Sequence, residues 1–177
     1  MADMTFNTPV GAVVARKMLV LYLNTGTEEA PVWSAVGKRV EDSSMGYDWG
    51  EESKTDIFGE IYTTLKTPVI TQTFDPCELD AGDKAQVKIW NQSIKEQDTA
   101  AMTNNDMLIV HTYAGDAASG VFAERYAACA VKPSGLGGSA NVGMPIDVTF
   151  GGTRTKGTAK LADGEVTFTP EQAAAAE

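Results

Sequence analysis

Residue types that bind transition metals or act as nucleophiles are scarce in this chain, which has two cysteines and one histidine among 177 residues. Cys77 and Cys129 stand far apart, outside any CxxC pair or Cys/His spacing, which excludes the common zinc and iron–sulfur motifs. They allow one disulfide at most, and we expect two unpaired thiols in a reducing compartment. Cys129 is expected in the core, and Cys77 is expected to be a poor nucleophile because Asp75 and Glu78 raise its pKa.

Positive charge is also scarce. Lys and Arg number 14 against 24 Asp and Glu, for a net charge of −10. Affinity for nucleic acid comes mainly from cations that neutralise phosphates, so this balance disfavours a protein that holds nucleic acid. It disfavours an anionic membrane surface for the same reason.

Long apolar runs are missing. The longest run, Met18–Leu23, is far shorter than the ~20 residues that a membrane helix requires. Asp3 stands where an export signal needs positive charge, and Arg16 and Lys17 follow the apolar run Val10–Ala15 instead of preceding it. We therefore expect a protein that is made and folded in a cytoplasm and has no membrane partner.

No catalytic or ligand-binding motif stands out. His111 lies within an apolar strand pattern, which favours a hydrogen-bonded strand histidine over a general base. The chain lacks a GxSxG elbow and the DxDxDG loop of calcium sites, and Gly135–Gly138 is not followed by the Lys-Ser/Thr of a P-loop. We expect no enzyme, no cofactor and no metal.

Acidic residues concentrate between positions 41 and 60, where seven carboxylates accompany one lysine, Lys54. Hydrophobic residues alternate through this block at Met45, Tyr47 and Trp49 and again over 57–64, which is the period of strands. The pattern predicts a long hairpin with carboxylates at its tip, residues 51–55.

One helix is predicted between Asp80 and Gln97, with Asp80 or Asp83 as its N-cap. Its buried face is expected to hold the residues that recur at helical spacing: Val87, Trp90, Asn91 and Ile94. Lys88 is expected on the solvent face, and residues 98–105 are expected to form a polar linker.

The rest of the chain alternates with the period of strands, predicted over 18–23, 32–36, 69–74, 107–113, 121–132, 142–150, 153–161 and 165–169. Gly151-Gly152 predicts a two-residue hairpin turn, and Asp163-Gly164 predicts another. The fold class is therefore α+β and mainly β, with a single domain over 18–169. Residues 1–17 are expected to form a flexible N-terminal arm and residues 170–177 a flexible C-terminal tail.

Arg154, Lys156 and Lys160 share one side of a predicted strand and form the only basic stripe. Two interpretations stay open. The stripe is either a solvated strand face or an intersubunit contact to the acidic block, since like subunits with opposite patches attract.

The order of these features resembles the major tail (tail-tube) proteins of long-tailed, non-contractile bacteriophages, over roughly residues 18–160. In the first half the resemblance rests on Trp33, Val36-Gly37-Lys38, Tyr47-Asp48-Trp49, Asp56-Ile57, a Thr-rich strand, and the acidic turn and helix of Phe74–Gln97. In the second half it rests on Glu124-Arg125-Tyr126, Val131-Lys132-Pro133-Ser134, Gly137-Gly138 and Thr155-Lys156-Gly157-Thr158.

This resemblance implies a β-sandwich or partial barrel flanked by one helix, assembled as hexameric rings that stack into a hollow tube. It also implies partners: further copies of the chain, a tape-measure protein, and tail-terminator or tip proteins. DNA would pass through without specific binding. The protein would be part of the virion tail, assembled in the host cytoplasm.

The acidic residues of the hairpin are the candidates for positions that face the lumen or stack rings: Asp48, Glu51, Glu52, Asp56 and Glu60. A negative lining avoids ion pairs that would trap a polyanion. Lys54 and Lys66 would weaken that effect if they faced the bore.

Two alternatives stay open. One is the inner-tube subunit of a contractile tail, pyocin or secretion-type apparatus. The other, from a different class, is a monomeric β-sandwich binding module, which predicts aromatic residues clustered at one loop end. Trp33, Trp49 and Trp90 are instead scattered along the chain.

Overall fold

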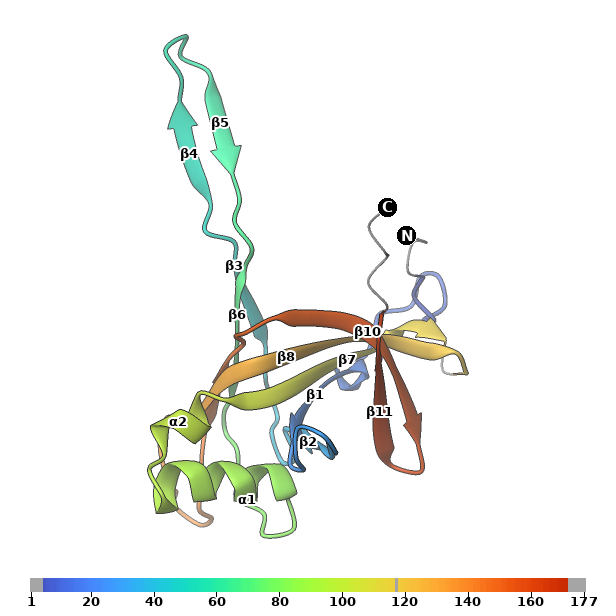
Figure 1. The fold of residues 1–177 in the computed structure, drawn as a ribbon, viewed down its shortest axis with the longest axis vertical. Coiled ribbons are helices and arrows are strands. Elements are labelled where there is room, and N and C mark those ends of the chain that lie inside the picture. The colour runs from blue at the N-terminus through green and yellow to red at the C-terminus, as the bar shows by residue number, and fades with distance from the viewer. Residues whose placement is uncertain (1–4, 117, 172–177) are drawn as a thin grey trace.

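The computed structural model describes residues 5–116 and 118–171. Nine strands of this part form one antiparallel sheet, and β4 and β5 form a separate two-stranded ribbon (Figure 1). The helical elements are η1 (Arg16–Met18), α1 (Lys84–Trp90), the π-helical turn η2 (Asn91–Lys95) and α2 (Thr99–Met102). The strands are β1 (Leu19–Asn24), β2 (Trp33–Val36), β3 (Met45–Asp48), β4 (Glu52–Thr55), β5 (Ile61–Thr64), β6 (Val69–Phe74), β7 (Asn105–Asp116), β8 (Gly120–Pro133), β9 (Ile146–Thr149), β10 (Arg154–Ala162) and β11 (Glu165–Pro170). The α+β, mainly β fold class expected from the sequence is confirmed.

The long strand β8 joins the two halves of the sheet. Along its first part β8 pairs with β7 and β10, and along its last part it pairs with β9, which leads on to β6 and β3. β8 changes its pairing partner at a β-bulge. The bulge is seen in the register, because Met107 pairs with Tyr126 while Asn105 pairs with Cys129. The extra residue puts Tyr126 and Cys129 in the same core cluster. Simple alternation along the predicted strand 121–132 puts Tyr126 and Cys129 on opposite sides, and the bulge overturns that expectation.

The Gly151-Gly152 pair does not make a hairpin. β9 and β10 pair with successive parts of β8 and not with each other. The two glycines therefore connect β9 to β10 along the same side of β8, next to the bulge. A Cβ at Gly152 would lie 2.0 Å from the Ala127 carbonyl oxygen, and one at Gly151 would lie 2.7 Å from that of Ala128. The glycines are therefore required by close backbone approach, and the predicted tight turn is wrong. The Asp163-Gly164 turn is confirmed, with Ala162 opposite Glu165.

Two apolar clusters lie on opposite sides of the β1–β7–β8 sheet. The larger is closed by α1 and by the β6 and β9 strands, and it contains Leu23, Phe74, Ile89, Met107 and Ile146 among others. The smaller lies under the β10–β11 ribbon and contains Tyr22, Trp33, Leu108, Val110 and Ala159 among others. Together they give every strand except β4 and β5 a buried or partly buried face.

The helix is shorter than predicted, and it buries a different face from the one predicted. Asp83 is the N-cap, with its Oδ1 accepting the N–H groups of Ala85 and Gln86 at 2.9 and 3.1 Å. The buried residues are Ala85, Gln86, Ile89 and Ser93, whereas Val87 is exposed. The expected polar linker instead contains α2 and the start of β7.

The arm begins with an attachment to the sheet. The Asn7 N–H donates to the Tyr113 carbonyl, the Gly115 N–H donates to that of Thr5, and the Phe6 ring lies edge-on to the Tyr113 ring. Flexibility of residues 1–17 stays a prediction. Of the predicted tail, Pro170 belongs to β11, and residues 172–177 lie outside the described part of the chain.

Candidate assembly surfaces

The β4–β5 hairpin stands away from the rest of the protein (Figure 1). Glu52 pairs with Thr64 and Thr55 with Ile61, and every residue of both strands is exposed. A two-stranded hairpin is only marginally stable in water by itself. A projection of this kind is therefore expected to be stabilised by contact with another molecule.

An ordered turn, residues 56–60, forms the tip. Asp56 Oδ1 accepts the N–H groups of Phe58 and Glu60 at 2.8 and 2.9 Å, and the Asp56 N–H donates to the Glu60 carbonyl. The long hairpin is as predicted, but its tip is not at residues 51–55, of which Glu52–Thr55 form β4. Alternation alone could not locate the turn, because Asp56-Ile57-Phe58 continues the strand pattern and only the side-chain bonds of Asp56 end it.

The tip is apolar as well as acidic. Ile57 is 94% exposed and Phe58 is 84% exposed, and Ile61 and Tyr62 beside them are exposed as well. Exposed apolar residues are ordinary when they are scattered, but a group of large ones at the end of a projection marks an interaction site. From the sequence, only the carboxylates of this segment were candidates.

The five acidic candidates all lie along this hairpin or at its base. Asp48 accepts a hydrogen bond from the Gly50 N–H, and Asp56 accepts one from the Phe58 N–H at the tip. Both carboxylates therefore stabilise the local backbone of the hairpin. Glu52 lies 2.5 Å from Lys66 Nζ and 3.9 Å from Lys54 Nζ. Both of the lysines that were expected to weaken the acidic character are thus placed beside Glu52. Glu51 and Glu60 are exposed, with no side-chain ion pair to the described residues.

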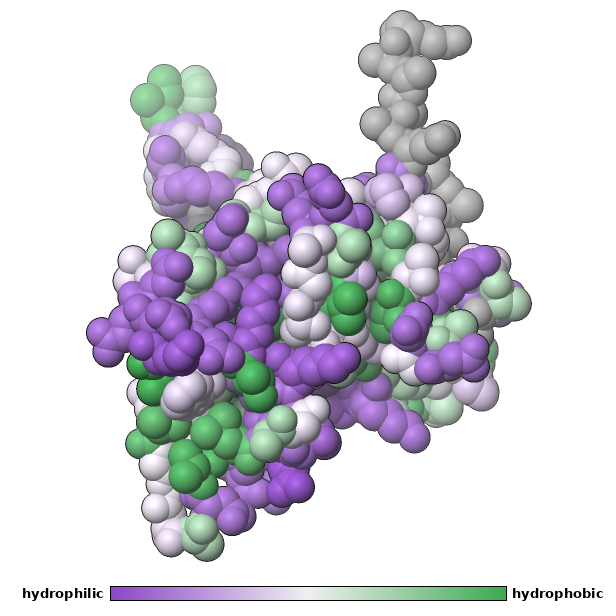
Figure 2. All heavy atoms as spheres, turned by 60° about the horizontal axis from the view of Figure 1, so that its bottom comes forward, coloured by the Kyte–Doolittle hydropathy of each residue, from purple (hydrophilic) through white to green (hydrophobic). Residues whose placement is uncertain are grey.

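A second apolar surface lies at the opposite end of the molecule, between α1 and the segment 136–142. It is a groove of about 680 Å³ lined by Leu79, Val87, Trp90, Leu136 and Val142 among others. Figure 2 turns this end forward and shows apolar residues gathered over it. Charged side chains flank the groove, with Lys38 Nζ 2.8 Å from Asp80 and Arg39 Nε 3.5 Å from the same carboxylate.

A buried carboxylate, Glu124, was missed by the sequence analysis. It is 5% exposed. It accepts hydrogen bonds from the Tyr126 hydroxyl at 2.9 Å and from Arg154 Nε at 2.5 Å, and its other oxygen lies 3.0 Å from His111 Nε2. Burial alone raises the pKa of Glu124, but the hydrogen bonds from His111 and Arg154 and the charge of Arg154 outweigh it and lower that pKa to about 2. The carboxylate is thus held ionised inside the sheet.

The hydrogen bonds to Glu124 also fix the positions of His111 and of Arg154 in the basic stripe. His111 Nδ1 lies 2.8 Å from the Tyr113 hydroxyl, so the expected hydrogen-bonded strand histidine is confirmed. Arg154 is tied to Glu124. Lys156 lies opposite Glu124 on β8, and Lys160 is exposed farther along β10. The stripe therefore combines an internal contact at Arg154 with an exposed lysine.

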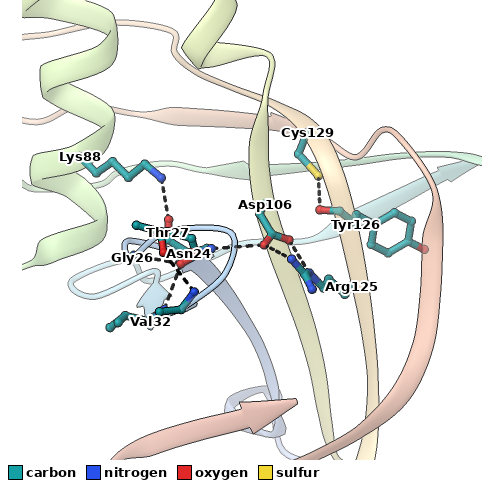
Figure 3. A network of polar contacts seen from close by, with 10 residues as sticks. Asn24, Gly26, Thr27, Val32, Lys88, Asp106, Arg125, Tyr126 and Cys129 are labelled. Carbon is teal, nitrogen blue, oxygen red and sulfur yellow. Dashed lines mark hydrogen bonds and ion pairs between the residues drawn. The ribbon is translucent and has the colours of Figure 1, made fainter. Parts of the chain in front are cut away.

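A second polar network joins the helix to the sheet (Figure 3). Arg125 donates two hydrogen bonds to Asp106, at 2.9 and 2.7 Å, and Asn24 Oδ1 accepts the N–H groups of Gly26 and Val32. Lys88 Nζ donates to the Asn24 carbonyl at 2.6 Å, which contradicts the solvent-facing position predicted for Lys88. These bonds satisfy buried groups and hold α1 against β1.

Both thiols are free and buried. Burial raises the pKa of Cys129 to about 11. Burial also raises the pKa of Cys77, with a further contribution from Asp83, so the direction expected for Cys77 is confirmed although Asp75 and Glu78 are not the cause. In the described ranges, no group of three His, Cys, Asp or Glu side chains is placed to hold a metal ion, and no helix has the length and apolar character needed to cross a membrane.

No family model matches the chain, and no curated protein matches it. Among solved structures, the chain is similar to one from the PVC sheath–tube complex of an extracellular contractile injection system in its extended state, with 13% identity and a TM-score of 0.46 over 84% of this chain and 94% of that one. It is similar to a chain of the tube-terminating cap of the anti-feeding prophage, with 16% identity and a TM-score of 0.44 over 86% and 96%.

A third similar structure is the PVC sheath/tube terminator, with 10% identity and a TM-score of 0.45 over 84% of this chain and 99% of that one. The three descriptions name a tube or a part that terminates one. They do not name the non-contractile type that the sequence had suggested. With TM-scores below 0.5 these similarities assign no function to the chain.

Proposed function

We propose that this chain is a structural protein that assembles with copies of itself into a tube, as hexameric rings stacked along an axis, and that it catalyses no reaction. The observation that carries the proposal is the β4–β5 hairpin. It has no extensive contact with the body of its own chain and ends in exposed Ile57 and Phe58. The order of motifs shared with tail-tube proteins gives separate support for the tube.

The sheet supports lateral assembly as well. β2 and β3 are the two ends of its main path, so each presents an edge to its surroundings. Exposed edges template pairing with further strands, and a ring closed through such edges removes them. We therefore place ring formation at the sheet edges and ring stacking at the hairpin.

The acidic candidates fit a conduit for DNA. Asp48, Glu51, Glu52, Asp56 and Glu60 keep the hairpin net negative despite Lys54 and Lys66. If these carboxylates line the lumen, a polyanion can pass without the ion pairs that would retain it. In this proposal the tape-measure protein and the tail-terminator or tip proteins are the partners, and the virion tail is the location.

Two kinds of tube accommodate such a subunit: a non-contractile phage tail, and the inner tube of a contractile apparatus. The descriptions of the similar structures agree better with the second, although their low similarity adds no weight to it. The outer surface distinguishes the two, because an inner tube must bind a sheath. Co-sedimentation of assembled tubes with a sheath protein of a contractile apparatus would support the contractile type.

Negative-stain electron microscopy over a concentration series, with light scattering, tests the proposal. Rings or hollow tubes are the expected result. A trimmed variant serves as the control, in which Asn-Gly replaces residues 50–65. The Lys66 N–H donates to the Trp49 carbonyl at 2.8 Å, which is the bond that closes a two-residue turn. The trimmed chain should fold but form no tubes. Monomers of the full chain at every concentration, even with a tip complex added, would contradict the proposal and favour the binding-module alternative.

A further inference from the structure

The hairpin tip and the groove beside α1 are exposed apolar surfaces that lie at opposite ends of the molecule (Figures 1 and 2). We propose that the tip of one copy docks in the groove of a second copy, with Ile57 and Phe58 against Leu136, Val142 and Trp90. This inference rests on the proposed self-assembly and specifies the surfaces that carry it.

The tip is suited to insertion because it is already ordered. Asp56 accepts two backbone N–H groups of the turn, and the Gly59 N–H donates to the Asp56 carbonyl at 3.1 Å. Gly59 has φ of 84°, a conformation that favours glycine. A loop that is ordered before binding loses less conformational entropy on docking. Ile57 and Phe58 are thus held outward on a defined turn, with little apolar contact inside their own chain.

The groove is suited to receive them because its floor is anchored in the core. Leu79 and Trp90 are partly buried and pack against the larger core cluster. Val87, Leu136 and Val142 form exposed apolar walls, each about half exposed. The space of about 680 Å³ is of the size that takes large apolar side chains. Occupation by Ile57 and Phe58 would remove apolar surface from water on both partners.

The rim of the groove carries two bases and two acids, and one of the bases can meet an acidic residue of the tip. At the groove, the Glu78 carboxylate accepts a hydrogen bond from Asn141 at 2.9 Å and the Asp80 carboxylate is paired with Lys38, so both acids are occupied. Arg39 lies 3.5 Å or more from its partners and keeps donors for a further contact. At the tip, Glu60 is exposed beside the apolar pair. We expect Glu60 of one copy to lie near Arg39 of the next.

This arrangement explains why the occupant is a second copy and not a segment of the same chain. The tip and the groove are distinct surfaces at opposite ends, so a copy that engages both joins one neighbour at each end. A head-to-tail contact of this kind continues in series instead of closing as a two-fold dimer. Such a series is what stacking along a tube axis requires.

Two variants test the contact, each altering one surface: Phe58→Asp at the tip and Leu136→Asp in the groove. Each should fold, because both side chains are exposed in the single chain. Each alone should fail to stack and should stop at single subunits or single rings. Phe58→Leu and Leu136→Met keep the apolar contact and should assemble like the unaltered chain.

Mixing the two charged variants gives the decisive result. A Phe58→Asp copy keeps an intact groove and a Leu136→Asp copy keeps an intact tip. An equal mixture should therefore form pairs, of subunits or of rings, that grow no further, as measured by sedimentation velocity. If the unaltered chain forms tubes and Leu136→Asp forms them equally well, the docking inference is overturned while the tube function stands. If the unaltered chain never assembles, both proposals fall.

Discussion

Among single residues, Glu124 shows most clearly how this protein uses a buried charge. The sequence presents it as one acid among 24 in an alternating strand. The fold surrounds it with His111, Tyr126 and Arg154, and each contributes a polar atom. Glu124 is a buried carboxylate with satisfied oxygens, and it ties β7, β8 and β10 together. Removing the carboxylate takes this partner from the Tyr126 hydroxyl and from His111 Nε2, which lie inside the sheet.

The first prediction concerns acid stability. The lowered pKa of Glu124, from 4.5 to about 2, corresponds to roughly 3 kcal/mol of stability near neutral pH, at about 1.4 kcal/mol per pKa unit. A depressed carboxyl pKa stabilises the fold above the unfolded value, and that stability is lost as the pH falls through 4.5 toward 2. Glu124→Gln should lower the free energy of unfolding by roughly 2–4 kcal/mol at pH 7. It should also weaken the dependence of that free energy on pH below 4.5. Urea unfolding from pH 7 to pH 3 measures both effects.

The matched control is Glu60→Gln, at an exposed position on the hairpin tip. It should change the free energy of unfolding by less than about 0.5 kcal/mol. If Glu124→Gln behaved in the same way as this control, the hydrogen bonds to Glu124 would not be stabilising the fold.

The second prediction concerns the thiols. Cys77 and Cys129 are fully buried, and burial raises the pKa of both. The thiolate is the reactive form, so a thiol reagent at pH 8 should modify neither residue in the native protein. Both should react at once in denaturant. Rapid modification of a native thiol, detected by mass spectrometry, would show that the strands around it open readily.

Among the structural elements, the β8 bulge and the glycines beside it act as one unit. The bulge lets one long strand pair with β10 and then with β9, and Gly151-Gly152 crosses it at close range. Each feature requires the other, because a side chain at either glycine would meet the Ala127 or Ala128 carbonyl oxygen. The bend joins the two halves of the sheet around the larger core.

The third prediction tests this unit. Gly152→Ala should destabilise the protein by roughly 2–4 kcal/mol, because the new Cβ would lie 2.0 Å from a carbonyl oxygen and φ is 70°. Gly135→Ala is the control, since no atom lies within 4 Å of its Cβ position. Urea midpoints compare the two variants. Equal midpoints would mean that the ribbon shifts easily at the bulge.

For the whole molecule, the distribution of charge is the property that matters for a tube. Asp56 and Glu52 have structural contacts inside the hairpin, so reversing their charge would mix a structural effect with an electrostatic one. Glu51 has no such contact with the described residues, and Glu60 is expected to lie near Arg39 of a neighbouring copy. Glu51 is therefore the position at which the charge of the hairpin can be changed with its shape and the docking contact intact.

The fourth prediction follows. Glu51→Lys should keep the fold and, in assembled tubes, should retain DNA at low salt, whereas the unaltered tubes should not. Binding of labelled DNA to sedimented tubes measures this, and raising the salt concentration should release the DNA. Equal DNA binding by both tubes would place Glu51 away from the lumen. Glu51→Gln controls for loss of charge without reversal.

Much of the fold was predictable from local pattern. Strands β1, β2, β6 and β8 were predicted within a residue or two of their observed bounds, because alternation and turn residues act over a few neighbouring positions. The Asp163-Gly164 turn and the Asp83 cap were predictable for the same reason. The tip of the hairpin was misplaced because Ile57 and Phe58 continue the strand pattern.

The sequence by itself determined the fold class, the acidic character, the burial of Cys129 and the existence of a long hairpin, since these follow from composition and short-range periodicity. Only the tertiary structure decided what Gly151-Gly152 does, which face of α1 is buried, and that Glu124 meets His111 and Arg154. It also decided that the apolar tip and the apolar groove lie at opposite ends. Each of these depends on segments far apart in the chain being brought together by the packing of the sheet, which local pattern does not record.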